Sequence, residues 1–114
     1  GSLEDRTRRI VDSRLELHER VGPLMRATLL HAGEHELLAA RLATVRRLLR
    51  EQTEDMFAPE LGAMGVGPRR EVAAAVDLLL GFESIEQLRK VRGLSLPATA
   101  RVVVRAVQAV VESA

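Results

Sequence analysis

The chain has 114 residues, of which 46% are apolar and 29% are charged, and its formal net charge is +1. This length and composition indicate one globular domain of ordinary size rather than a disordered segment. The near-neutral balance excludes the concentrated basic face of a free nucleic-acid-binding protein, and the absence of cysteine excludes disulfides and thiolate metal sites.

The first predicted helix covers about residues 3–20, after a Gly-Ser pair at 1–2 that resembles the remnant of a cleaved purification tag. The apolar stripe that predicts this helix consists of Leu3, Ile10, Val11, Leu15, Leu17 and Val21. Gly22 and Pro23 are expected to end or kink it, since proline lacks the backbone donor and clashes with the preceding turn. A short second helix then runs from Pro23 to about His31, and Gly33 closes it.

Three further helices follow in the second part of the chain. The third is expected over residues 34–57, with the stripe Leu38, Leu42, Val45, Leu49 and Met56. Residues 58–67 contain one proline and three glycines, which predicts a loop with at most one helical turn. Pro68 opens a fourth helix that reaches about residue 91, and Gly93 stops it. Ser95 is a plausible N-cap for a fifth helix, which has Pro97 in its first turn and ends near Glu112.

The fold class is therefore all-α, a five-helix bundle, because no strand pattern interrupts these helices. Residues 72–80 and 102–111 are apolar nearly all the way round, so each of the last two helices needs cover on every side. A second copy of the chain supplies it most simply, in a four-helix bundle between the subunits of a homodimer. A monomer with both helices at its centre is the alternative. The residues expected at the dimer interface are Val76, Leu80, Ile85, Val103, Val107 and Val110.

No motif for catalysis or for a metal ion can be read. His35 and Glu36 begin the H-E-x-x-H pattern, but Ala39 stands where the second histidine is needed. His31 and His35 have the spacing of a metal clamp, yet Gly33 lies between them and predicts exposed loop histidines. No histidine has a glutamate three residues before it, as di-iron bundles require. The sequence therefore predicts a protein that is not an enzyme and has no cofactor.

Polar residues within apolar stripes suggest a ligand pocket. His18, Gln52 and Glu83 each fall at a helical spacing among apolar neighbours. A buried polar group needs a partner, which is either another protein group or a ligand, and both readings stay open for each of the three. Apolar walls would come from residues on several helices. The full set expected to bind a ligand is His18, Met25, Leu29, Val45, Leu49, Gln52, Met56, Phe82 and Glu83, with Phe57 as a further candidate for the walls.

The stretch LLLGFESIEQLR at 78–89, followed by RGLS at 92–95, resembles the end of many tetracycline-repressor (TetR) family transcription regulators. Residues 19–27 and 57–61 resemble the same family's ligand domain, so the likeness covers most of residues 14–112. It implies a pocket enclosed by the first helices, a homodimer made by the last two, and a small apolar or amphipathic effector. It also implies that DNA is contacted only by an N-terminal helix-turn-helix, which nothing in this chain resembles.

Residues 3–114 are thus expected to be the C-terminal effector-sensing and dimerisation domain of a bacterial, cytoplasmic regulator, in which a small molecule changes DNA affinity. No stretch is apolar enough to span a membrane, and no signal peptide pattern is present. The alternative reading is a helical protein–protein interaction module that holds no ligand. The identity of the effector and the choice between repressor and activator stay open.

Overall fold

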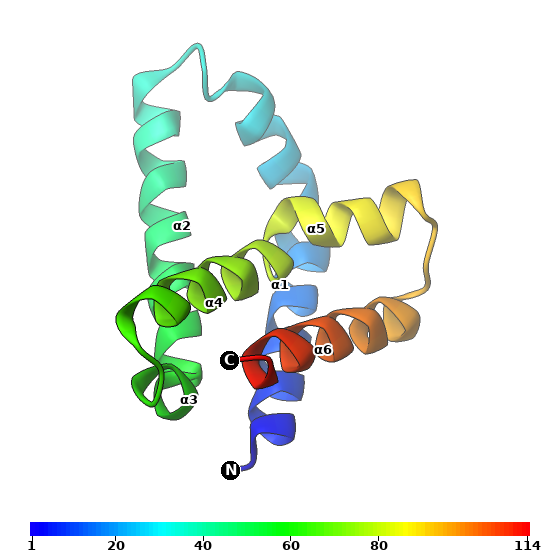
Figure 1. Ribbon diagram of the computed structural model, residues 1–114. Coiled ribbons are helices and arrows are strands. Elements are labelled where there is room, and N and C mark those ends of the chain that lie inside the picture. Colours follow the sequence, from blue (N-terminus) through cyan, green and yellow to red (C-terminus); the bar gives the residue numbers. More distant parts are fainter.

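The computed structural model describes residues 1–114. Its regular secondary structure consists of helices joined by short turns, without a strand (Figure 1). The all-α prediction is confirmed. The elements in chain order are α1 (Leu3–His31), α2 (Glu36–Met56), α3 (Ala58–Gly62), α4 (Val66–Leu79), α5 (Phe82–Glu86), the π-helix η1 (Gln87–Val91) and α6 (Leu96–Glu112). None of these helices combines the length and the apolar character needed to cross a membrane.

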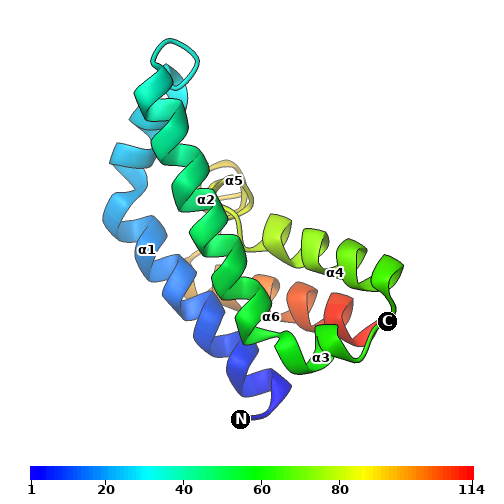
Figure 2. The same ribbon diagram turned by 90° about the vertical axis from the view of Figure 1, so that its left-hand side faces the viewer.

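The helices form two layers that cross each other. Helices α1 and α2 lie side by side in one layer, while α4 and α6 run antiparallel in the other, with α6 across α1 and α4 against α2 (Figures 1 and 2). The core lies where the layers meet. Its buried members are Ile10, Val11, Leu15, Phe57, Leu61, Val72, Val76, Leu80, Ile85, Val103, Val107 and Val111. The fold therefore places the first half of α1 inside the domain and leaves its second half beside α2.

Helix α1 is one continuous helix of 29 residues with Pro23 in its interior, so the separate helix expected from Pro23 to His31 does not exist. A proline costs one helical hydrogen bond and bends a helix, but it does not have to end one. Figure 1 shows the ribbon of α1 changing direction in its last turns. The buried face also differs from the expected one, since Leu17 and Val21 are only half-buried whereas Arg14 and His18 are buried.

The expected helix from Pro68 to residue 91 is broken into three parts. It begins two residues earlier, at Val66, and α4 ends at Leu79, before Gly81. Gly81 has an extended backbone (φ −70°, ψ 159°) and starts α5, and a Cβ there would lie 3.2 Å from the Leu78 carbonyl oxygen. The Ser84 hydroxyl donates to that same carbonyl at 2.6 Å, which closes the corner. The chain therefore turns at Gly81, and α5 leaves the axis of α4.

Helix α6 matches its predicted bounds. The Ser95 hydroxyl accepts a hydrogen bond from the Ala98 amide at 3.2 Å, and Pro97 lies in the first turn. Gly93 stops the preceding segment with φ +68°, a left-handed conformation that glycine adopts without steric cost. The Leu94 amide then donates to the Leu88 carbonyl at 3.0 Å. The predicted start of α6 at Ser95 and Pro97 and the predicted stop at Gly93 are therefore confirmed.

Five of the six residues expected at a dimer interface lie inside the single chain. Val76, Leu80, Ile85, Val103 and Val107 are each exposed by 3% or less. Helix α6 packs against α1 and α4, α4 also packs against α2, and Ile85 of α5 joins the same core, so these side chains present no surface to a second copy. Only Val110 is half-buried. An interface on these helices must instead use their outward positions, such as Val102, which is 43% exposed.

Candidate functional site: a cleft between α1, α2 and α5

A cleft of about 280 Å³ lies between α1, α2 and the corner where α4 meets α5. Apolar and charged side chains each make up about half of its wall. The lining residues are Arg14, Met25, Leu42, Val45, Arg46, Leu49, Arg50, Asp77, Leu78, Gly81, Phe82 and Glu83. Small-molecule sites combine apolar walls with convergent polar groups, and this cleft has both, with a larger charged share than is usual.

Arg14 is the most unusual residue of the wall, because it is a charged side chain that is only 4% exposed. Its Nη2 donates hydrogen bonds to three neutral oxygens of α2: the Leu49 carbonyl at 2.7 Å, Thr53 Oγ1 at 3.0 Å and Gln52 Oε1 at 3.3 Å. Its Nε is buried without a partner. The guanidinium therefore holds α1 to α2 while part of its hydrogen-bonding capacity is unused.

Burial lowers the pKa of Arg14 below its ordinary value, and the negative charge of Asp77 opposes this effect. An arginine keeps its charge even in such surroundings, so the base of the cleft is cationic. At the rim, Arg46 donates from Nη2 to Glu83 Oε1 at 2.9 Å, and both side chains are more than half exposed. This ion pair satisfies two of the charges that border the cleft, and the exposed Arg50 is the third arginine of the wall.

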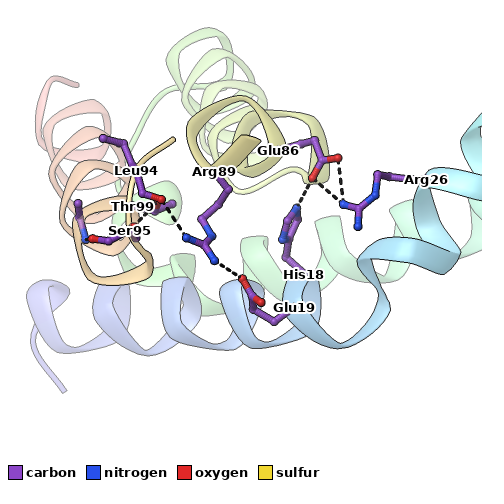
Figure 3. A network of polar contacts seen from close by, with 9 residues as sticks. His18, Glu19, Arg26, Glu86, Arg89, Leu94, Ser95 and Thr99 are labelled. Atoms are coloured by element: carbon purple, nitrogen blue, oxygen red, sulfur yellow. Dashed lines mark hydrogen bonds and ion pairs between the residues drawn. The ribbon is translucent and has the colours of Figure 1, made fainter. Parts of the chain in front are cut away.

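His18 does not line the cleft, but its ring packs against Phe82, which does. The two rings lie with their centroids 4.9 Å apart and tilted by 31°. His18 is 6% exposed, and its Nε2 lies 2.8 Å from Glu86 Oε1 (Figure 3). Arg26 Nη1 donates to both Glu86 oxygens at 3.0 Å. Burial alone would raise the pKa of Glu86, but the hydrogen bonds from His18 and Arg26 outweigh it and hold the pKa below its ordinary value.

A second set of contacts continues this network to the turn before α6 (Figure 3). Arg89 donates from Nη2 to Glu19 Oε1 at 2.8 Å and from Nη1 to the Leu94 carbonyl at 2.9 Å. The hydrogen bond and charge of Arg89 lower the pKa of Glu19. Helix α1 is thus connected through side chains to α5, to η1 and to the residues that begin α6.

The cleft brings together five of the nine residues expected to bind a ligand, namely Met25, Val45, Leu49, Phe82 and Glu83. His18 is one contact away, behind Phe82, and Gln52 reaches the site only through Arg14. The other two lie outside the cleft. Leu29 is half-buried further along α1, and Met56 packs against the core together with the buried Phe57. Of the three polar residues singled out in apolar stripes, only His18 is buried, since Gln52 and Glu83 are exposed.

The sequence did not predict five polar residues of this region, namely Arg14, Thr53 and Asp77 together with the exposed Arg46 and Arg50. Arg14 follows Ile10 by four positions and Val11 by three, so its spacing places it on the buried face of α1. The charge of its side chain would instead predict an exposed position. Thr53 is the buried polar residue of α2, one position after the Gln52 that was expected there. Asp77 is half-buried in α4, and the direction of that helix brings it to the cleft.

Four larger hollows lie elsewhere on the surface. One of about 540 Å³ lies along α2 beside the turn that follows α1, and Leu42 is the one large apolar residue of its wall. Those of about 570 Å³, between α1 and α6 and between α2 and α4, have walls in which charged side chains predominate over large apolar ones. Another of about 540 Å³ follows a single face of α6, with Ala98, Val102 and Ala106 along it. A groove on one helix suits another helix better than a small molecule. The cleft at Arg14 is the one walled by three separate segments around a buried charge.

No group of three or more histidine, aspartate or glutamate side chains comes together in a way that could hold a metal ion. His31 and His35 are exposed at the turn between α1 and α2, as predicted, and His31 Nδ1 lies 3.4 Å from Glu34 Oε2. Comparison of the chain with protein-family models, with curated proteins and with solved structures finds no match.

Proposed function

We propose that the chain is the effector-sensing and homodimerisation domain of a TetR-like transcription regulator, with the cleft at Arg14 as the effector site. The single observation that supports this most is the cleft itself, since α1, α2 and α5 converge there around apolar walls and a buried charge. DNA would be bound by a helix-turn-helix domain outside these residues, as in the family that the sequence resembles.

The contacts around the cleft suggest how binding would be sensed. Phe82 borders the cleft and is the first residue of α5, and the same helix contains Glu86, which is bonded to α1. A ligand that displaces Phe82 would therefore act on the contacts of His18 and Arg26 with Glu86. The Arg89 contacts continue from there to the start of α6. A ligand can shift such an arrangement only by binding its two states with different affinities.

The outward face of α6 is the surface that suits a second copy of the chain. Ala98, Val102 and Ala106 recur there at intervals of four residues and line a groove of about 540 Å³. Small residues allow two helices to approach closely, and a two-fold axis beside α6 would pair it with its own copy. We therefore propose this surface as the dimer interface in place of the five predicted interface residues that are buried in the core.

Binding of an uncharged apolar probe tests the effector site directly. We expect 1-octanol to raise the melting temperature of the chain by several degrees at saturation, because a ligand that binds only the folded state stabilises it. Val45→Phe should abolish this shift by filling the cleft, and Val45 is 38% exposed, so the fold should tolerate the change. Native mass spectrometry of the purified chain would in addition give the mass of any ligand that co-purifies.

Val91→Phe is the matched control, since it makes the same substitution at an exposed valine of η1 outside the cleft. The octanol shift should persist in this variant. A wild-type chain that forms dimers but shows no shift and carries no adduct would support the alternative, a helical interaction module without a ligand. A shift that survives in Val45→Phe would place the octanol site elsewhere and contradict the assignment of this cleft.

A further inference from the structure

Arg14 lacks the acidic partner that its burial calls for. A buried charge is costly unless an opposite charge or a full set of hydrogen bonds compensates it. Arg14 is 4% exposed, yet its partners are all neutral and no carboxylate lies within 4.0 Å of it. Arg89 offers the contrast. It also has a buried Nε without a partner, but its guanidinium is paired with Glu19 at 2.8 Å.

The charges around the cleft leave room for a negative group beside Arg14. Three arginines and two acidic residues border the cleft, which gives it one excess positive charge. Arg46 and Glu83 pair with each other at the rim. Asp77 is the remaining acid, and it attracts Arg14 only from beyond ion-pair distance. The third arginine, Arg50, is exposed, so water can solvate its charge. Arg14 is buried, and it is the cation that a charged group of a ligand would compensate.

We infer that the ligand of this cleft is a carboxylate with an apolar body, whose carboxylate binds the Arg14 guanidinium and whose body lies along Met25, Leu49 and Phe82. This inference rests on the proposed effector site and adds the chemical class of the effector. Arginine is suited to the task, because its planar donors match the geometry of a carboxylate. The volume of about 280 Å³ corresponds to about nine water molecules. A ligand of about ten non-hydrogen atoms, such as octanoate, is therefore the right size.

The test compares octanoate with octanamide, which has the same number of non-hydrogen atoms and no charge. Isothermal titration calorimetry at pH 7 should show that the wild-type chain binds octanoate at least tenfold more tightly than octanamide. Arg14→Met keeps an apolar chain of similar length and removes the charge, so the ratio of the two affinities should fall to about one. Arg92→Met, at an exposed arginine that does not border the cleft, should keep the wild-type ratio.

A second variant tests the same point without altering Arg14. Asp77→Asn removes the one acid that competes for Arg14, so it should strengthen octanoate binding about threefold and leave octanamide unchanged. Equal affinities of the wild-type chain for both probes would overturn the carboxylate inference and leave the effector site standing. A tenfold preference that persists in Arg14→Met would also overturn it, because the anion would then bind elsewhere. Failure of both probes to bind would overturn the effector site as well.

Discussion

At the scale of single residues, His18 and Arg14, the two buried side chains of α1 that can carry a charge, differ in how they are satisfied. His18 has a carboxylate at 2.8 Å and an aromatic ring against its face, so its burial is compensated within the chain. Arg14 has only neutral acceptors and an unpartnered Nε. A residue that is costly to the fold and borders a cleft is typical of a functional position, since function and stability are often in conflict there.

This difference predicts the stability of Arg14→Met in the absence of ligand. The free energy of unfolding should be unchanged or higher by about 1 kcal/mol, because methionine removes a buried unpaired charge and still fills space. Thr53 Oγ1 already donates to the Leu49 carbonyl at 3.0 Å, so that acceptor keeps a partner. Urea unfolding monitored by circular dichroism measures the effect. A loss of 3 kcal/mol or more would mean that Arg14 is required by the fold.

Arg6→Met is the matched comparison, and it should be destabilising by about 1–2 kcal/mol. Arg6 makes a two-pronged ion pair with Glu60 at 2.6 and 2.7 Å and also donates to the Met56 carbonyl at 2.8 Å. Its removal leaves Glu60 without the cation that lowers its pKa. Arg6 and Arg14 should thus respond to the same substitution in opposite ways.

At the scale of the elements, the turn between η1 and α6 depends on the backbone of Gly93. A residue with a side chain meets steric hindrance at φ +68°, although a Cβ at this position would touch no neighbouring atom within 4 Å. Gly93→Ala should therefore lower the free energy of unfolding by about 1 kcal/mol, purely through backbone strain. Thermal unfolding of the variant checks this.

Gly67→Ala provides the control for that substitution. Gly67 lies in the first turn of α4, has no positive φ, and has open space around its Cβ position. Alanine there should raise the free energy of unfolding by about 0.5 kcal/mol, because it restricts the unfolded chain and favours helix. If both variants lost stability equally, the left-handed backbone at Gly93 would not be the cause.

The elements also show how far the sequence determines this fold. The bounds of α6 were predictable because Ser95, Pro97 and Gly93 act locally, through capping and backbone geometry. The corner at Gly81 was not predicted, since the apolar pattern continues through it and only tertiary packing selects the turn over a straight helix. The continuity of α1 was missed for the opposite reason, because its packing overrides the local effect of Pro23.

The cleft was predictable only in part, for a related reason. Met25, Val45, Leu49 and Phe82 were found as apolar residues on helices expected to surround a pocket. Arg14 was not predicted because a charged side chain is expected to face solvent. Its spacing from Ile10 and Val11 nevertheless places it on the buried face of α1. Asp77 reaches the cleft only through the direction that α4 takes, and no local pattern specifies that direction.

At the scale of the whole molecule, pairs of arginine and glutamate join helices that are far apart in sequence. Glu60 of α3 is paired with Arg6 of α1, Glu86 of α5 with Arg26 of α1, and Glu19 of α1 with Arg89 of η1. Hydrogen bonds from these arginines lower the pKa of Glu60 and of Glu19, and those from His18 and Arg26 lower the pKa of Glu86 against its burial. The layers are therefore connected by carboxylates that favour the charged form in the folded state.

These shifts predict loss of stability in acid. The folded pKa values lie below the ordinary glutamate value of about 4.3, so the unfolded chain binds protons first as the pH falls. The free energy of unfolding should be level above about pH 5 and should decrease progressively below about pH 4.3. Urea unfolding at a series of pH values measures this. Glu60→Gln should flatten the decrease, and an unchanged slope in that variant would contradict the role given to its ion pair.

The proposed dimer gives a prediction at the same scale. Val102→Lys on the outward face of α6 should convert a wild-type dimer to a monomer in sedimentation equilibrium. Arg101 and Arg105 line the same groove, so the new lysine adds to the like charge on both sides of a two-fold interface. The melting temperature extrapolated to low protein concentration should stay near that of the wild-type chain, since Val102 is 43% exposed within one subunit. A dimer that persists in this variant would place the interface on another surface.

Pro23 gives α1 an uneven flexural stiffness. The carbonyl of Glu19 has no amide donor at Pro23, so one rung of the hydrogen-bond ladder is missing at that point. Before it lies the half of α1 fixed in the core, and beyond it lie the turns that include Met25 at the cleft. Bending at the missing rung costs less than bending anywhere else along the helix. The wall at Met25 can therefore follow the shape of its contents while the core half of the same helix stays in place.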